Sequence, residues 1–420
     1  MTIPCQAARG SPDDLRQDHG AGTRGLRRRA VAAPRHFPRG RLEPCHAMRV
    51  GFDLTCLKAP MGGYERYASC LLEALVRLPE PPQMVVFTER AYARRLVPPG
   101  AESHPIATLP RFLLKVFLQD QTYWPLMMRR ARVDVVHTPI FAGMIAALRP
   151  YVLTVHDLIP LQTPAALSRS AATYWRLILP RTILRADAVI TGSEFTRREI
   201  LGYFGLPPER VVTVPHGVAP RFAPVNDETT LARVRSCYSL PDRFLLFVGI
   251  ASPRKNIDRL VRAFGALADS DRGDAHLLIA GPPGWKNAAL SAAMAVSPIA
   301  SRIRHLGIVA DEDLPALYGL ARGVVNLSSH EGFGLPALEA LACGAPLVCA
   351  DRTSFPEVVG DAALQVDPDD EAAIRRALAT VLAAGPEVAA RRARGLVRAR
   401  TFTWERAAAA TLAVYRRVAA

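Results

Sequence analysis

Hydrophobic residues in this chain gather in short runs that alternate with longer amphipathic stretches. The first run after Met48 is RVGFDL, and the stretch 64–78 that follows places Tyr67, Leu71 and Leu75 on one helical face. Later runs are apolar without alternation, as in strands of a parallel sheet that helices cover on both sides. The pattern predicts an α/β protein in which strands and helices alternate along the chain.

The runs fall into two series, each of which predicts a Rossmann-like sheet. Strands of the first series are expected at 49–54, 84–87, 133–137, 151–156, 188–191 and 211–214. Strands of the second are expected at 243–248, 275–280, 303–306, 323–327, 347–350 and 363–366. Helices of the second series are expected at 256–268, 286–296, 312–321, 336–343 and 370–384. A basic helix is expected at 387–400, and a last helical stretch at 404–418 could return to the first series.

The two series and their flanks divide the chain into four expected parts. These are a leader (1–47), an N-terminal domain (48–225), a C-terminal domain (226–400) and a last helix that returns to the first domain (401–420). The leader is rich in arginine and lacks apolar periodicity, so we expect it to be disordered. It has no continuous apolar stretch of the kind that a secretory signal needs. It is either a flexible tail of the protein or the result of a translation start that was assigned upstream of the true one.

Net charge and the placement of aromatic residues narrow the classes of molecule that the protein is expected to bind. The chain has a formal net charge of +15, which suits a nucleic acid, an anionic membrane or a phosphorylated ligand. Aromatic residues are not interleaved with the basic runs, so no nucleic acid is expected. The segment 111–133 mixes basic, apolar and aromatic residues. It could lie on an anionic membrane or form an ordinary helix with a basic side.

Cysteine usage and hydropathy indicate a cytoplasmic protein. The seven cysteines are scattered and form no CxxC pair, which favours reduced thiols over disulfides or a zinc site. No stretch approaches the roughly 18–20 uncharged apolar residues of a membrane span. We therefore expect a cytoplasmic location, with peripheral contact to the inner face of the cytoplasmic membrane as an extension.

The segment 324–351 contains a predicted strand, a loop with two glycines, a helix and a second strand. Parallel sheets bind ligands at the carboxyl ends of their strands, and glycines before a helix offer backbone N–H groups to an anion. Glu331 and Glu339 flank this loop, and a carboxylate suits the vicinal diol of a sugar. The segment predicts a ligand with a phosphate beside a sugar. Two solvated surface glutamates are the alternative.

Other polar residues also follow predicted strands. Arg254 and Lys255 follow the first strand of the second series, where two adjacent cations suit a diphosphate. His156 ends a strand of the first series, and a histidine there is often structural. Ser193 and Glu194 follow another strand, where an N-cap with a first-turn acid is the ordinary interpretation. All of these candidates lie at carboxyl ends of strands, so we treat them as one site.

The chain resembles the family 4 glycosyltransferases, retaining enzymes of the GT-B fold, in which two Rossmann-like domains face each other across a cleft. The resemblance covers about 48–420, and the spacing from Glu331 to Glu339 around the glycine loop is its most specific part. Its segments are GGYERY (62–67), VHDLIP (155–160), ITGSEFTRREI (190–200), VPHGV (214–218), GIASPRKNIDRLVRAF (249–264), IAGPPGW (279–285), HLGIVADEDLPALYGLA (305–321), EGFGLPALEALACGAPLV (331–348) and SFPEVVGDAALQVDPDD (354–370).

The resemblance implies a role for each chemical residue. Arg254 and Lys255 would bind the donor diphosphate and stabilise the leaving nucleotide. Glu331 would hold hydroxyls of the donor sugar, and Glu339 would take the ribose diol. His156 would reach the donor sugar from the opposing domain.

The resemblance also implies the surroundings of the donor. The donor-side residues would be Gly62, Gly63, Gly332, Phe333, Gly334 and Leu335. Acceptor-side candidates are Glu65, Arg66, Ser193 and Glu194. Neither a metal nor a cofactor is implied, because the basic pair and the helix N-terminus would take the place of a metal. Two positions depart from the family pattern: His216 stands where relatives usually have Asn, and Glu65 stands near a position that is often Gly.

The expected activity is the transfer of a hexose with retention of configuration. Mannose from GDP-mannose is the favoured donor. The acceptor would be a glycan or a lipid-linked saccharide in the biosynthesis of a cell-surface polysaccharide such as lipopolysaccharide. Two other classes stay open: a catalytically silent GT-B binding or scaffold protein, and another GT-B enzyme such as a sugar-nucleotide epimerase or a phosphorylase.

Overall fold

The structure is a computed structural model that describes residues 47–57, 62–106, 120–140, 143, 145, 149–163, 169–282, 284 and 288–420. Residues 1–46 of the expected leader lie outside these ranges. Of the expected membrane-contacting segment, only 120–133 lies inside them. No helix among the described residues combines the length and the apolar content that crossing a bilayer requires.

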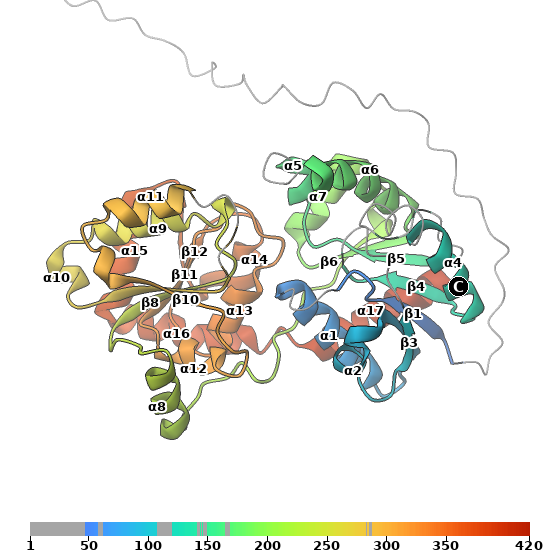
Figure 1. Cartoon of the computed structure of the whole chain (residues 1–420), viewed down its shortest axis with the longest axis horizontal. Helices are drawn as coiled ribbons and strands as arrows, with labels where there is room; N and C mark the ends of the chain where they lie inside the picture. The colour runs from blue at the N-terminus through green and yellow to red at the C-terminus, as the bar shows by residue number, and fades with distance from the viewer. Residues whose placement is uncertain are drawn as a thin grey trace, which may run out of the picture. The chain divides into compact units, whose positions relative to one another are not determined.

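Among the described residues, the first sheet has seven parallel strands in the order β3-β2-β1-β4-β5-β6-β7. They are β1 (Arg49–Asp53), β2 (Gln83–Glu89), β3 (Glu102–Ile106), β4 (Val135–Thr138), β5 (Tyr151–Thr154), β6 (Ala188–Thr191) and β7 (Val211–Thr213). Figure 1 labels β1, β3, β4, β5 and β6 of this sheet. All six expected strands are present. The seventh, the edge strand β3, was missed because its sequence ESHPI is polar and contains Pro105, which only edge strands tolerate.

Helices cover both faces of this sheet. One apolar core joins the sheet to α1 (Gly63–Val76) and to the last helix of the chain, α17 (Trp404–Ala419). The other core joins it to α4 (Trp124–Arg130), α6 (Arg169–Arg185) and α7 (Glu194–Phe204). Two short helices, α2 (Ala93–Leu96) and α5 (Ile159–Gln162), also belong to this part. The first sheet and these helices, α17 included, are called the first half below.

The second sheet has six parallel strands in the order β10-β9-β8-β11-β12-β13. They are β8 (Phe244–Val248), β9 (His276–Ala280), β10 (Ile303–Gly307), β11 (Gly323–Asn326), β12 (Leu347–Ala350) and β13 (Leu364–Val366). Its helices are α8 (Glu228–Cys237), α9 (Ile257–Gly265), α10 (Asp269–Arg272), α11 (Ala288–Val296), α12 (Leu314–Leu320), α13 (Leu335–Ala342), α14 (Phe355–Val359), α15 (Glu371–Ala383) and α16 (Pro386–Ala399). This sheet and its helices are called the second half.

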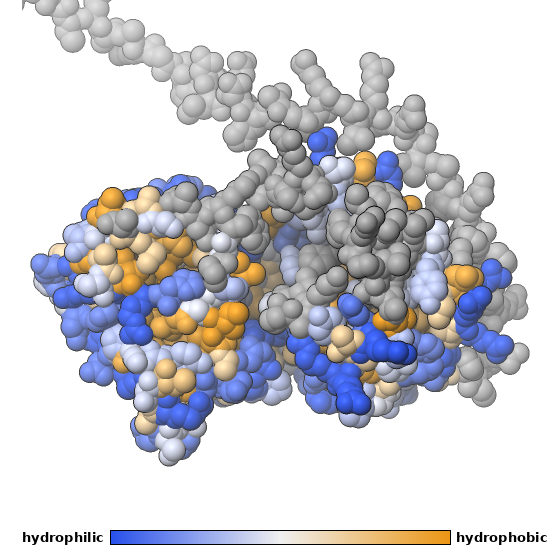
Figure 2. Space-filling model, viewed as in Figure 1, coloured by the Kyte–Doolittle hydropathy of each residue, from blue (hydrophilic) through white to orange (hydrophobic). Residues whose placement is uncertain are grey.

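Each half of the described chain is a Rossmann-like layer of sheet between helices, so the expected fold class is confirmed. Apolar cores lie on both faces of the second sheet, as they do on the first. On the surface drawn in Figure 2, hydrophobic residues gather over the part of the second half that carries α9 and α11, where Val296 is 81% exposed.

The order of strands brings the candidate residues to adjacent loops. In the second sheet β8 pairs with β11, so the loop with Arg254 and Lys255 lies beside the loop with Glu331. In the first sheet β5 pairs with β6, so His156 and Ser193 follow neighbouring strands. The order of each sheet reverses beside its first strand, which is where open α/β sheets bind ligands.

Candidate active site

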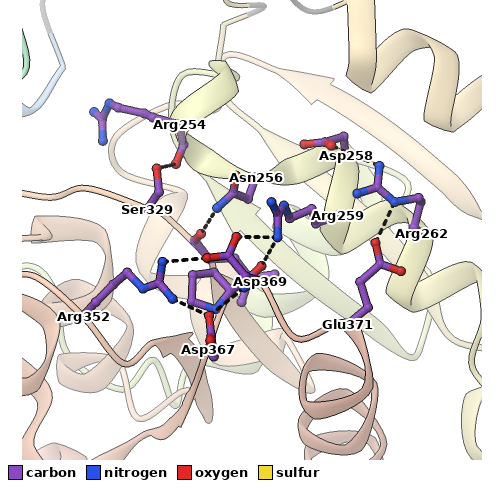
Figure 3. Close-up of polar contacts among 12 residues, drawn as sticks. Arg254, Asn256, Asp258, Arg259, Arg262, Ser329, Arg352, Asp367, Asp369 and Glu371 are labelled. Atoms are coloured by element: carbon purple, nitrogen blue, oxygen red, sulfur yellow. Dashed lines mark hydrogen bonds and ion pairs between the residues drawn. The ribbon is translucent and has the colours of Figure 1, made fainter. Parts of the chain in front are cut away.

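A single 3₁₀ turn at Pro253–Lys255 presents the two cations after β8. The next residue, Asn256, has a left-handed backbone with a φ of 51°, and its side-chain amide donates to the carbonyl of Leu327 at 2.8 Å. The hydroxyl of Ser329 donates to the carbonyl of Arg254 at 3.1 Å (Figure 3), and the backbone N–H of Ser329 donates to the same carbonyl at 2.8 Å. The turn is therefore fastened to the loop that follows β11.

Ion pairs on the adjoining surface fix α9 as well (Figure 3). Arg259 donates to the carbonyl of Pro368 and lies 2.6 Å from a carboxylate oxygen of Asp369. Arg262 pairs with Glu371 at the start of α15 at 2.8 Å. These contacts join α9 to the segment before α15 and to the first residue of that helix.

Both cations meet one carboxylate. The ammonium of Lys255 hydrogen-bonds to Oε1 of Glu331, and Nη1 of Arg254 lies 3.0 Å from the same oxygen. Lys255 and Glu331 are only 7% and 8% exposed. Burial alone would raise the pKa of Glu331, but Arg254 and Lys255 outweigh it and hold that pKa at about 2. The cluster therefore contains two cations and one anion, and its net charge of +1 favours a further anion.

The glycine loop offers backbone donors beside this cluster. The N–H groups of Gly332, Phe333 and Gly334 donate to no acceptor within the described ranges. Gly334 has a φ of 92°, a conformation that glycine adopts readily, and it leads directly into α13. Free N–H groups at the start of a helix are suited to bind an anion. The loop and the basic pair can thus hold the same diphosphate.

Glu339 lies in α13, and only 1% of its surface is exposed. The hydroxyl of Tyr318 donates to its Oε2 at 3.1 Å, and Nη1 of Arg66 donates to its Oε1 at 2.5 Å. Burial raises the pKa of Glu339, and the guanidinium of Arg66 opposes that rise. Glu331 and Glu339 are thus both buried and charge-paired, which contradicts the alternative of two solvated surface acids.

His156 is held as a neutral imidazole. Its ring lies edge-on to Tyr64 and Tyr67, at centroid distances of 5.1 and 4.7 Å, and burial lowers its pKa to about 4. Nε2 lies 3.0 Å from the carbonyl oxygen of Pro139, which can only accept, so the proton is on Nε2. Nδ1 then carries a lone pair, with which it can accept a hydrogen bond from a hydroxyl.

A pocket of the first half opens beside His156. Its lining residues are Tyr64, Thr154, Val155, His156, Asp157, Pro160, Trp175 and Leu179. Burial raises the pKa of Asp157, while Arg254 of the second half opposes the rise. Tyr64, Asp157 and Trp175 were not among the predicted site residues. The adjacency of Asp157 to His156 was a usable signal, whereas Trp175 lies in a helix without any motif.

The structure separates the four acceptor-side candidates. Two of them pair within the first half: Glu65 with Arg95, and Glu194 with Arg197 and Thr213. The other two reach the second half, one at α13 and the other at the glycine loop (Gly332–Gly334), which is called the donor loop below. Arg66 contacts Glu339, and Ser193 donates to the carbonyl of Gly332 at 2.7 Å.

Two further positions lie next to the donor loop. A Cβ atom built on Gly63 would lie 3.9 Å from Cδ1 of Leu335, which places the loop of Gly62 and Gly63 beside the start of α13. His216 is buried, and its ring packs against Tyr67 and Phe333 at centroid distances of 4.4 and 4.6 Å. His216, one of the two departures from the family pattern, thus contacts α1 and the glycine loop together.

Two family models match the chain. The model of the glycosyl transferases group 1 matches residues 238–395, and the model of glycosyltransferase family 4 matches residues 61–222. O-antigen chain mannosyltransferase B of Escherichia coli is 31% identical over 380 residues, which are 88% of this chain and 100% of that protein. The serotype-specific mannosyltransferase WbdA of Escherichia coli is 32% identical over 52% of this chain, but this match spans only 27% of WbdA.

Solved structures show the same fold. Anabaena Alr3699/HepE in complex with UDP and glucose superimposes with a TM-score of 0.68, over 87% of this chain and 100% of that one. Its sequence identity is 16%, so this likeness concerns the GT-B fold alone. The family models and the full-length relative carry the assignment further. The chain belongs to the family 4, group 1 glycosyltransferases, and it is an enzyme of that class.

Proposed function

We propose that the protein is a retaining hexosyltransferase, with mannose from GDP-mannose as the favoured donor. The acceptor would be a glycan or lipid-linked saccharide in cell-surface polysaccharide biosynthesis. The observation that carries the proposal is the buried cluster of Lys255, Arg254 and Glu331 beside the N–H groups of the glycine loop, which donate to no acceptor in the part of the chain that the structure describes. Mannose is supported by the two relatives named as mannosyltransferases.

In this proposal Arg254 and Lys255 receive the diphosphate of the donor. Negative charge builds up on the departing phosphate in the transition state, and buried cations that are already in place stabilise it strongly. Glu331 keeps both cations in position until the donor arrives, because it pairs with each of them. The donor sugar then lies next to Glu331, whose carboxylate accepts hydrogen bonds from its hydroxyls.

The acceptor is proposed to bind from the first half, in the pocket beside His156. Tyr64 and Trp175 provide aromatic surface for a sugar ring, and Asp157 provides a carboxyl for its hydroxyls. The bond from the anomeric carbon to the phosphate oxygen breaks, and a bond from that carbon to the acceptor oxygen forms on the same face. The acceptor proton passes to the departing phosphate. Glu331 is paired with two cations, which supports such a path over one with a carboxylate nucleophile.

A screen of nucleotide sugars tests the proposal. The thermal stability of the protein is measured with GDP-, UDP-, dTDP- and ADP-sugars, and GDP-mannose should give the largest increase. Transfer of mannose is then followed with saccharide acceptors, and NMR of the product should show the anomeric configuration of the donor. Stabilisation by none of these compounds would overturn the proposal.

The same assays distinguish the alternatives. A silent scaffold would bind a nucleotide sugar without transferring or hydrolysing it. An epimerase would convert the sugar nucleotide in the absence of acceptor, and a phosphorylase would release sugar phosphate only when phosphate is added.

We also propose that the enzyme works in the cytoplasm at the membrane that holds a lipid-linked acceptor. Within the described part of the basic segment, Tyr123 and Leu126 are exposed apolar residues, and Arg129 and Arg130 are exposed cations of α4. Such a surface is suited to anionic lipid headgroups. Binding to anionic vesicles should be strong at low salt and weak at high salt. Equal binding to neutral vesicles would contradict this mechanism.

A further inference from the structure

The N-terminus of α7 in the first half meets the glycine loop of the second half. The hydroxyl of Ser193 donates to the carbonyl oxygen of Gly332 at 2.7 Å, and the hydroxyl of Thr196 lies 3.3 Å from the same oxygen. Both hydroxyl residues are buried. One carbonyl of the donor loop is thus held by two side chains from the opposing half.

A carboxylate of the second half binds the same helix end. Oε2 and Oε1 of Glu357, in α14, accept the backbone N–H groups of Glu194 and Phe195 at 2.7 and 2.5 Å. The first N–H groups of a helix have no acceptor within the helix, and a negative charge is favoured at that end. Oγ of Ser193 accepts a hydrogen bond from the backbone N–H of Thr196 at 3.1 Å. The second half therefore supplies two of the acceptors that the first turn of α7 requires.

The bond to Gly332 also orients a donor N–H. The carbonyl of Gly332 and the N–H of Phe333 belong to one planar trans peptide, so they point in opposite directions. When the oxygen is drawn toward α7, the N–H of Phe333 points away from α7, and no described residue accepts it. The loop also passes close to the first half at this point, because a Cβ on Gly332 would lie 1.8 Å from the carbonyl oxygen of His156.

We propose that Ser193, aided by Thr196 and Glu357, is a positioning residue that sets the peptide of Gly332 and Phe333 for the donor diphosphate. This inference rests on the proposed function, because it concerns the same donor site. Ser193 then acts on the donor through the loop and does not touch the acceptor. The backbone donors of the second half take their binding orientation from contact with the first half.

Calorimetric binding of GDP, with UDP as a second probe, tests the inference on the full chain. Ser193→Ala should weaken binding of the nucleotide that wild type binds by about tenfold, the effect of one lost hydrogen bond. Ser193→Thr retains the hydroxyl and should restore most of the affinity. The donor KM should rise in Ser193→Ala while the acceptor KM stays the same.

Thr403→Ala is the matched control. Thr403 caps α17 by accepting the N–H of Arg406 at 3.2 Å, as Ser193 caps α7. Loss of either cap lowers the melting temperature, but only Ser193→Ala should weaken nucleotide binding. If Ser193→Ala does not fold, Thr196→Val makes the same comparison, because it removes a hydroxyl that contacts Gly332 and keeps the shape.

The possible outcomes separate the positioning role of Ser193 from the proposed function. Unchanged affinity in the serine or threonine variant would overturn the positioning role, and so would equal weakening by Thr403→Ala. If wild type binds neither GDP nor UDP, the proposed function itself fails, whatever the variants do.

Discussion

Arg66 of the first half places Nη1 2.5 Å from Oε1 of Glu339, a carboxylate of the second half that is almost fully buried. Its Nη2 lies 2.8 Å from Asp311, and its guanidinium lies over the ring of Phe222. A buried carboxylate is costly unless a cation accompanies it. The proposed ribose-binding acid therefore depends on α1 for its charge balance.

Arg66→Ala should destabilise the protein by on the order of 3 kcal/mol, because it leaves a buried charge without its partner. Burial already raises the pKa of Glu339, and loss of Arg66 raises it further. The free energy of unfolding that Arg66→Ala loses relative to wild type should therefore be largest at neutral pH. This loss should shrink as the pH falls toward 4.5, the ordinary pKa of the group, because Glu339 is then protonated. Urea unfolding of both proteins at several pH values measures this.

The exposed pair of Arg77 and Glu73 provides the control for that experiment. Its side chains are 72% and 46% exposed, so Arg77→Ala should change stability little at any pH. A deficit of Arg66→Ala that did not depend on pH would contradict the role of Glu339.

Arg254→Ala and Lys255→Ala should each lower kcat/KM by about a hundredfold, because each removes a cation from the departing phosphate. Arg262→Ala is the matched control: it removes a cation of α9 that pairs with Asp258 and Glu371. Steady-state kinetics with the identified donor make the comparison. Wild-type turnover by both variants would refute the phosphate-binding role.

Glu331→Ala should abolish transfer while the nucleoside diphosphate still binds, because the carboxylate is assigned to the transferred sugar. Calorimetry with the nucleoside diphosphate and a transfer assay on the same preparation check both parts. If nucleotide binding disappears as well, Glu331 is structural, and its pairing with Arg254 and Lys255 is its main role.

Glu331→Gln should change how the free energy of unfolding depends on pH, because it removes the charge that pairs with Arg254 and Lys255. The pKa of Glu331 is lowered from 4.5 to about 2, so its ionised form stabilises the fold above pH 4.5. Wild type should exceed Glu331→Gln by on the order of 3 kcal/mol at neutral pH. The difference should diminish between pH 4.5 and about 2, as the carboxylate of wild type is protonated. Unfolding curves across this window show whether it does.

Gly332→Ala should lower the affinity for the donor by more than its loss of folding stability can explain. The added Cβ would lie 1.8 Å from the carbonyl oxygen of His156, and backbone atoms cannot move aside cheaply. Gly202, in α7, has nothing within 4 Å of such a Cβ, so Gly202→Ala should be neutral or stabilise by about 0.5–1 kcal/mol. Melting temperatures and donor affinities of both variants separate the two effects. Normal donor affinity in Gly332→Ala would show that the loop tolerates displacement.

The strands were predictable because burial on both faces leaves a continuous apolar run, as FLLFV of β8 shows. β3 was not, because an edge strand needs no such run and accepts Pro105. Arg254, Lys255 and Glu331 could be grouped from sequence because each follows a strand of one sheet. The bond between Ser193 and Gly332 joins positions 139 apart that follow strands of two different sheets, and no local pattern encodes such a contact.

The position of α17 has a consequence for how the chain folds while it is being translated. Trp404, Leu412 and Tyr415 of α17 fill the core that β1 and α1 begin, and the hydroxyl of Tyr415 lies 2.6 Å from Nδ1 of His137 in β4. During translation these residues leave the ribosome after the whole second half has emerged. We therefore expect the second half to fold while the sheet made first still lacks part of its core. The half that is synthesised first is then completed last, when the final turns of the chain dock onto it.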